Sequence, residues 1–117
     1  MKPAKEHNNG QWTKARFNSF IKGALRSATK RWGPINEARK RARISHGVYK
    51  CVGYKKRWHK VRWKDGVYVD HIEPVIGPEG FETWDLVVER MFVEMDKLQI
   101  LCKECHVRKT KDERKKR

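Results

Sequence analysis

Apolar side chains recur every three to four residues along residues 12–31, which is the spacing of one face of an α-helix. These positions are Phe17, Phe20, Ile21, Ala24, Leu25 and Ala28. Gly33-Pro34 is expected to end this helix, and Asn36 is expected to cap a second helix, rich in Arg and Lys, over residues 37–44. Residues 1–10 are polar and are predicted to form a turn or a disordered lead-in.

From Val48 onward the apolar positions alternate, which favours β-strands. Three segments show this period: residues 48–51, 58–63 and 67–69. Lys64-Asp65-Gly66 fits a tight turn that would join the second and third segments as a hairpin.

A loop rich in Pro and Gly separates these strands from a second helical region. Residues 81–93 predict an amphipathic helix, residues 96–101 a short extended segment, and Cys102 the start of a last helix that runs into the basic tail 114–117. The inward side of the helix over residues 81–93 is expected to consist of Trp84, Val87, Val88, Met91 and Phe92.

The length of 117 residues predicts one domain with an extension rather than two full domains. The order of elements predicts an α+β fold, with a basic helical extension over residues 1–45 and the remaining strands and helices in a module over residues 46–117. The apolar fraction is 38%, so the core is expected to be small, and chains with little to bury often add a metal. No apolar run approaches the length of a membrane span, and no signal peptide is visible, so we expect a soluble, intracellular protein.

The net charge is +15, and it is unevenly distributed along the sequence. Counting Lys and Arg against Asp and Glu gives +10 for residues 1–45, +6 for 46–69, −6 for 70–100 and +5 for 101–117. Basic segments on both sides of an acidic stretch predict a polyanion partner, and charge alone favours DNA and RNA equally. The basic side chains of the first helix that we expect to contact DNA are Lys14, Arg16, Lys22 and Arg26.

Two tryptophans, Trp58 and Trp63, lie within the most basic strand segment. Aromatic side chains among Lys and Arg can stack on nucleic-acid bases. Five tryptophans in so short a chain favour a place in the core instead.

The motifs richest in chemistry are Asp70-His71, at the end of a predicted strand, and Cys105-His106, at the start of the last predicted helix. A carboxylate and one imidazole can hold a divalent ion, and a second imidazole can take a proton from water. Adjacent residues of a strand point to opposite sides, so Asp70 and His71 need not compete for one ligand position. The pattern predicts a hydrolytic metal site.

These motifs resemble those of phage-type HNH endonucleases. The resemblance rests on three stretches: Val69-Asp70-His71-Ile72-Glu73-Pro74-Val75, then Gly80-Phe81-x-x-Trp84-Asp85, then Leu98-Gln99-x-Leu101-Cys102-x-x-Cys105-His106-x-x-Lys109-Thr110-Lys111. The leader, with Trp12-Thr13-x-Ala15-Arg16-Phe17, is similar to that of the same small phage proteins. The resemblance covers nearly the whole chain and implies a ββα-metal fold.

The resemblance also implies roles for individual residues. His71 matches the general base, and Asp70 and His106 match the ligands of a catalytic divalent ion, expected to be Mg²⁺ or Mn²⁺, with other transition ions open. Lys109 and Lys111 are candidates for holding the DNA backbone. The expected partner is duplex DNA and the expected location is the host cytoplasm if the protein is phage-encoded.

One departure from the family pattern concerns catalysis. Lys97 stands where the family has the Asn that braces the base histidine and its loop. Lysine cannot accept a hydrogen bond, so the brace must come from elsewhere, either Asp96 or a backbone carbonyl. The sequence therefore supports a metal-dependent endonuclease that nicks or cuts DNA, with a catalytically weakened or inactive DNA- or RNA-binding protein as the alternative.

A second departure concerns a structural zinc site. Three cysteines cannot pair completely, and Cys-x-x-Cys in a basic intracellular chain more often indicates metal or thiol chemistry than a disulfide. The family often has two Cys-x-x-Cys pairs, and here the second pair is reduced to Cys51, with Tyr54 in its other place. Zinc held by Cys51, Cys102, Cys105 and His59 is one interpretation. His46 as the fourth ligand, or apolar packing around Tyr54 without zinc, are the others.

Overall fold

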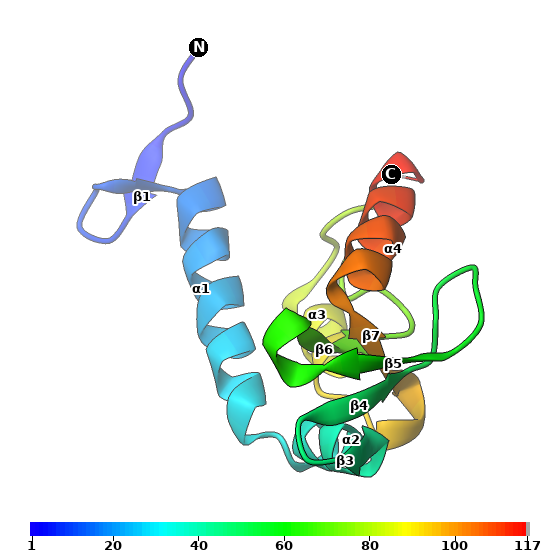
Figure 1. Cartoon of the computed structure of the whole chain (residues 1–117). Helices are drawn as coiled ribbons and strands as arrows, with labels where there is room; N and C mark the ends of the chain where they lie inside the picture. The colour runs from blue at the N-terminus through cyan, green and yellow to red at the C-terminus, as the bar shows by residue number, and fades with distance from the viewer. Residues whose placement is uncertain (117) are drawn as a thin grey trace. The chain divides into compact units, whose positions relative to one another are not determined.

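The computed structural model describes residues 1–116, and the chain divides into two compact units, Met1–Lys30 and a second unit that begins at Arg31 (Figure 1). Over the described residues the protein has four α-helices and small antiparallel sheets. The predicted α+β class is therefore confirmed. None of these helices combines the length and the apolar character needed to span a membrane.

The first unit is a small hairpin followed by a helix. Strands β1 (Lys5–His7) and β2 (Trp12–Thr13) pair antiparallel across Asn8-Asn9-Gly10, all three of which have positive φ. Helix α1 (Lys14–Ala28) starts two residues later than predicted, after β2, because the Thr13 hydroxyl caps it by accepting a hydrogen bond from the Arg16 amide at 3.2 Å. A 3₁₀ turn, η1 (Thr29–Arg31), follows α1.

The apolar stripe of α1 is not part of a core. His7 stacks on Phe17 with ring centroids 4.6 Å apart, and Trp12 contacts Phe20 at 5.2 Å, but no residue of α1 is buried. Phe20 remains 56% exposed. The first unit by itself does not enclose the stripe, since a unit of thirty residues has too little apolar surface to do so.

Helix α2 (Gly33–Ala42) opens the second unit and begins earlier than predicted. Gly33-Pro34 starts this helix, since proline is compatible with the first helical turn, where its missing N–H has no partner to lose. Asn36 therefore lies inside the helix and not at its cap. The prediction that Asn36 caps this helix was therefore wrong.

Strands β3 (Arg43–Ser45), β4 (Val48–Cys51) and β5 (His59–Arg62) form one antiparallel sheet, and β6 (Val67–His71) pairs with β7 (Leu98–Cys102) in another. The predicted hairpin across Lys64-Asp65-Gly66 was wrong. Residues Trp63–Asp65 form a 3₁₀ turn, η2, after which the chain enters a different sheet. Strand β6 pairs instead with β7, whose side chains are apolar at every position except Gln99.

Two helices flank the second sheet. Helix α3 (Trp84–Met91) is capped by Thr83 and buries Val87 and Met91, whereas Val88, predicted to point inward, is 42% exposed because it lies about 100° around the helix from Val87. A 3₁₀ turn, η3 (Met95–Lys97), leads into β7, and α4 (Lys103–Lys115) follows it directly.

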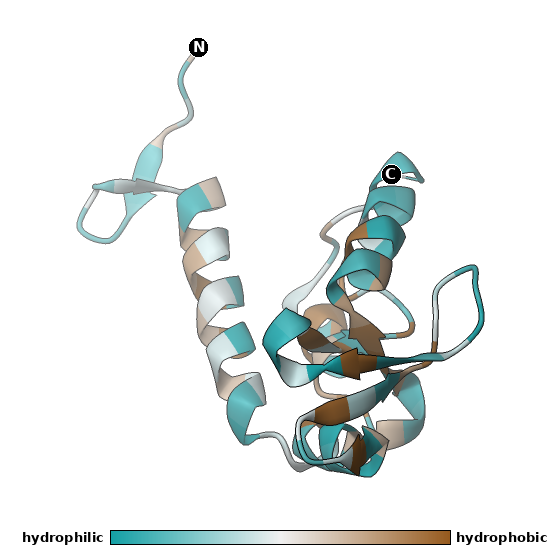
Figure 2. Cartoon of the chain, viewed as in Figure 1, coloured by the Kyte–Doolittle hydropathy of each residue, from teal (hydrophilic) through white to brown (hydrophobic). Residues whose placement is uncertain are grey.

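The core of the second unit contains two clusters of buried residues, beside the buried Val87, Met91 and Ile100. Figure 2 shows brown, hydrophobic segments along the strands of this unit. One cluster contains Cys51, Leu101, Cys102 and Cys105. The other contains Ile35, Ala38 and Leu98. Because α2 supplies Ile35 and Ala38 and packs on β7, residues 31–45 belong with the module and the two units divide after Lys30, whereas the sequence placed the boundary at residue 45.

Candidate metal centres

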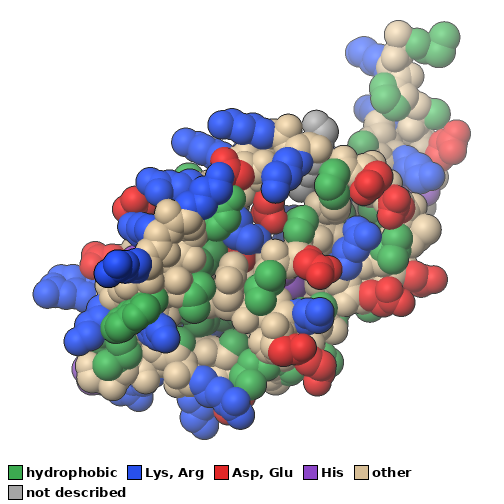
Figure 3. Space-filling view, turned by 90° about the vertical axis from the view of Figure 1, so that its right-hand side faces the viewer, with side chains coloured by type: hydrophobic (Ala, Val, Ile, Leu, Met, Phe, Trp, Pro, Cys, Tyr) green, Lys and Arg blue, Asp and Glu red, His purple; other side chains and the backbone are tan. Residues whose placement is uncertain are grey.

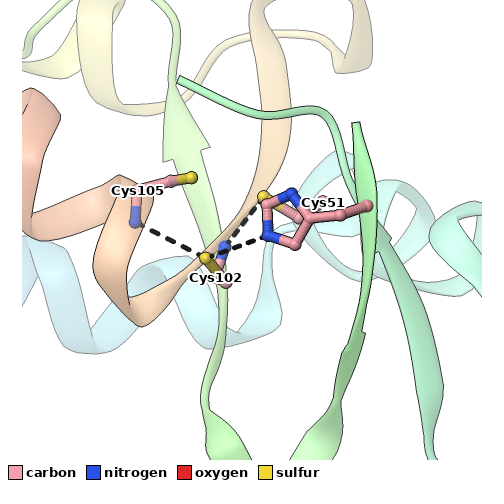
Figure 4. A group of neighbouring side chains, drawn as sticks. Cys51, Cys102 and Cys105 are labelled. Carbon is pink, nitrogen blue, oxygen red and sulfur yellow. Dashed lines mark hydrogen bonds between the residues drawn. The ribbon is translucent and has the colours of Figure 1, made fainter. Parts of the chain in front are cut away.

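A first candidate centre forms where β4, β5, β7 and α4 meet. Cys51 ends β4, His59 begins β5 directly opposite it, Cys102 ends β7, and Cys105 lies in the first turn of α4 (Figure 4). Their four ligand atoms lie within 4.8 Å of one another, and all three cysteines are buried free thiols. This cluster could hold a metal ion.

Hydrogen-bond donors surround the sulfur atoms of this cluster. The Cys102 amide donates to Cys51 Sγ at 3.2 Å, the Gly53 amide to the same sulfur at 3.4 Å, and the Cys105 amide to Cys102 Sγ at 3.5 Å. His59 Nε2 lies 3.4 Å from Cys102 Sγ. Amide donors directed at sulfur stabilise thiolates, which are the form of cysteine that binds metals.

The pKa values of the Cys51 and Cys102 thiols are shifted in opposite directions. Burial raises the pKa of Cys51 to about 11. Burial also raises the pKa of Cys102, but the Cys105 amide and the His59 ring outweigh it and bring that pKa down to about 7. The Cys102 thiol therefore ionises in part near pH 7, and a bound cation would favour ionisation of the other two thiols.

The loop after Cys51 is shaped to deliver its amide to the sulfur. Gly53 has φ +84, and a Cβ at this position would collide with the carbonyl oxygens of Lys56 and Arg57. Only glycine fits such a close approach of two backbone segments. Gly53 is a feature of the site that sequence reasoning missed.

The structure decides which residue completes the cluster. Tyr54, in the place of the missing cysteine, packs against the cluster and donates its hydroxyl to Asp112 Oδ2 at 2.7 Å. His46 is exposed and contacts Arg43. Of the two histidines considered from the sequence, His59 is therefore the fourth residue of the Cys51 cluster. The hydrogen bond of Tyr54 joins the loop after Cys51 to α4.

A second candidate centre lies at the end of β6 and the start of α4. Asp70 is 8% exposed, and its Oδ2 accepts hydrogen bonds from Gln99 Nε2 at 2.9 Å and from Lys109 Nζ at 3.1 Å. Its Oδ1 lies 3.9 Å from His106 Nε2. Two ligand atoms that share one ion at about 2.1 Å each are separated by roughly 3–4 Å, so this pair fits the predicted metal ligands.

Lys109 has a different role from the one expected. It is 7% exposed, and its Nζ donates to the His71 carbonyl at 3.0 Å and to Glu113 Oε2 at 3.0 Å, in addition to Asp70. Burial lowers the pKa of Lys109, but Glu113 and Asp70 outweigh it and raise that pKa overall. A lysine so enclosed cannot reach a phosphate, so the predicted DNA contact is corrected to an internal ion pair that orients Asp70.

His71 is oriented by a backbone carbonyl. Its Nε2 lies 2.8 Å from the carbonyl oxygen of Met91, which can only accept, so Nε2 carries the proton and Nδ1 is the basic nitrogen of the neutral ring. Met91 is the last residue of α3. Of the two sources of a brace left open by the sequence, the carbonyl is the one the structure supplies.

Lys97 is close to this histidine without touching its ring. It is exposed and lines, with His71 and Glu89, a hollow of about 210 Å³. Its backbone carbonyl accepts the Ile72 amide at 3.0 Å, which fixes the chain just after His71. The backbone carbonyls of Met91 and Lys97 therefore hold the His71 ring and the chain that follows it.

The remaining predicted residues are exposed or half-buried. The His106 ring stacks on Tyr68, with centroids 4.9 Å apart and planes within 13°. Among residues 1–116, the Cys51 cluster is the one group of three or more potential ligands in close range, so Asp70 and His106 form a pair without a third protein ligand. Lys111 is exposed, as are Lys14, Arg16 and Arg26, whereas Lys22 is partly buried.

No protein-family model matches this sequence, and neither curated proteins nor solved structures give a significant match to it.

Proposed function

We propose that this protein is a metal-dependent nuclease of the HNH type that hydrolyses DNA phosphodiester bonds. The observation that carries the proposal is the pairing of Asp70 Oδ1 with His106 Nε2 at 3.9 Å, next in sequence to a histidine whose Nδ1 is left unprotonated by its bond to Met91. A carboxylate–imidazole pair that can hold a divalent ion and a free imidazole base are sufficient groups for metal-assisted phosphodiester hydrolysis.

In this proposal His71 Nδ1 removes a proton from a water molecule as its oxygen attacks phosphorus. The bond from phosphorus to the 3′ oxygen breaks, and this oxygen takes a proton from solvent water, which leaves a 5′ phosphate and a 3′ hydroxyl. His71 then returns its proton to solvent. Asp70 and His106 would hold a divalent ion such as Mg²⁺ or Mn²⁺, which supplies charge stabilisation for the leaving oxygen. Lys109 and Gln99 keep the Asp70 carboxylate fixed, and Tyr68 holds the His106 ring by stacking.

DNA affinity would come from the basic surface. Figure 3 shows a face on which Lys and Arg side chains gather mostly on one side and carboxylates on the other. The acidic stretch is residues 70–100, so the phosphate backbone would follow the basic segments instead. The proposed DNA contacts are Lys111 and four basic side chains of α1, namely Lys14, Arg16, Lys22 and Arg26.

We also propose that the ion of the Cys51 cluster is structural Zn²⁺. Three thiols and one imidazole are a closed ligand set typical of such sites. A separation of up to 4.8 Å is wider than the roughly 3.8 Å expected around zinc, so the ligands would move slightly inward on binding. The two core clusters are small, which makes a metal valuable for the stability of this unit.

A second candidate function is nucleic-acid binding without catalysis. Lys97 in place of Asn favours it, because this cationic residue lines the same hollow as His71, together with Arg90 and two glutamates. A cation near the base disfavours its protonation and would slow the reaction.

Nicking of supercoiled plasmid, titrated with Mg²⁺ and with Mn²⁺, tests the proposal. Asp70→Asn and His106→Ala should each require much more metal for half-maximal nicking than the wild-type protein does. Lys111→Ala is a control on the same helix that keeps the metal pair. No nicking by the wild-type protein at any metal concentration, with duplex binding retained, would favour the second function.

A further inference from the structure

Two tryptophans near β5 lie at the surface. Trp58 is 55% exposed and Trp63 is 52% exposed. The number of tryptophans favoured the core for both, and the structure contradicts that interpretation. Single exposed apolar side chains are common on protein surfaces, so the neighbours of each ring decide whether the ring has a role.

The alternation of side chains along β5 indicates on which face of the sheet each ring lies. Along β5 the burial pattern alternates, with His59 and Val61 half-buried and Lys60 and Arg62 exposed. Trp58 immediately precedes β5 and falls in step with Lys60 and Arg62, whereas Trp63 contacts Tyr49, whose register partner is Val61. The two exposed rings therefore belong to opposite faces of the sheet.

The neighbouring strand adds a cation to the Trp58 side. Lys50 pairs with Lys60 across the sheet, and its Nζ lies over the Trp58 ring at 5.2 Å from the centroid. Among the described residues, no ion pair involves Lys50, Lys60 or Arg62. Their charges are therefore available to an external anion. We call Lys50, Trp58, Lys60 and Arg62 the Trp58 face.

We propose that the Trp58 face binds single-stranded nucleic acid. Alternate residues of a strand lie about 7 Å apart, so the ring and the two cations that follow it form a row along one strand. Unpaired bases can stack on an exposed ring while neighbouring phosphates meet the cations. In a duplex the bases are already stacked, so the ring would have no partner and only the charges would act. The inference does not rest on the catalytic proposal, because it uses none of the residues of the metal pair.

Binding is measured by fluorescence anisotropy with labelled oligothymidylate, oligouridylate and a duplex of equal length, without added Mg²⁺ or Mn²⁺. Trp58→Ala should weaken binding to the single strands by roughly tenfold and leave duplex binding almost unchanged, because loss of one stacked base is local. Lys60→Gln should lower the slope of log affinity against log salt by about 0.7 on single strands. The two single-stranded probes distinguish DNA from RNA as the better ligand.

The matched control is Trp63→Ala, which removes an equally exposed ring from the opposite face and should leave single-strand affinity unchanged. Trp58→Phe, which keeps an aromatic surface, should retain most of the affinity, and circular dichroism establishes that each variant is folded. Unchanged single-strand binding by Trp58→Ala would overturn the inference. An equal loss on duplex and single strands, or an equal loss in Trp63→Ala, would overturn it too.

Discussion

Replacing Lys109 by methionine tests the part of the site that the sequence did not reveal. The methionine keeps most of the side-chain volume but removes the ammonium group that donates to Asp70, to Glu113 and to the His71 carbonyl. Asp70, 8% exposed, would keep Gln99 as its donor. A buried carboxylate left without its cation is strongly destabilising.

The magnitude follows from the burial of the partners. Removing one member of a buried ion pair costs about 3–5 kcal/mol. Glu113 is 23% exposed and can be partly hydrated, so we expect the lower end, about 3 kcal/mol. Adding Asp70→Asn to Lys109→Met removes the unpaired charge and should restore part of that loss, which a double-mutant cycle detects.

Equilibrium urea unfolding of the wild-type protein, Lys109→Met, Asp70→Asn and the double variant measures these free energies of unfolding. Lys111→Met, an exposed lysine of the same helix, is the control and should change stability by less than about 0.5 kcal/mol. If Lys109→Met unfolds like the control, then Lys109 does not hold Asp70, and the account of a preformed carboxylate is refuted.

Three further predictions concern the first centre. Removing metal with a chelator should lower the melting temperature sharply in the wild-type protein and much less in Cys105→Ser, which has already lost a ligand; equal melting curves before and after chelation would exclude a structural metal. Gly53→Ala should destabilise the protein by at least 1 kcal/mol, because a Cβ collides with the Lys56 carbonyl, and a neutral effect in thermal unfolding would contradict that geometry. The hydrogen bond from Lys55 and then that from Tyr54 lower the pKa of Asp112. The stability that this carboxylate contributes is therefore present above its ordinary pKa of 3.8 and is lost as the pH falls through the lowered value. The melting temperature of Asp112→Asn should fall less between neutral and acidic pH than that of the wild-type protein, which a pH series of melting curves measures.

Much of the fold could be predicted because local patterns fixed it. The helical spacing before Arg31 and after Thr83 produced α1 and α3, and the alternation from Val48 produced β4. The pairing of β6 with β7 could not be predicted, since the two strands are separated by α3 and the sequence offered a closer partner across Gly66. Strand pairing at long range depends on which apolar surfaces meet, and that is not a local property.

The candidate site shows the same division. The resemblance to HNH endonucleases implied Asp70 and His106 as a pair, and the structure brings their atoms to 3.9 Å. The Met91 carbonyl that orients His71 belongs to the backbone and leaves no signal in the sequence. Lys109 carried a misleading signal. A lysine near a motif that resembles those of HNH endonucleases suggests a phosphate contact, whereas its burial beside two carboxylates makes it a structural cation.

The most direct test of the central claim is a time course of supercoiled plasmid nicking by the wild-type protein and by His71→Ala, purified in parallel and assayed in Mn²⁺. His46→Ala is the matched control, since His46 is an exposed histidine outside both centres. We predict that the wild-type protein and His46→Ala nick at equal rates, and that His71→Ala is slower by about 10²–10⁴ while it binds DNA as well as the wild-type protein. Equal nicking by His71→Ala would contradict the account.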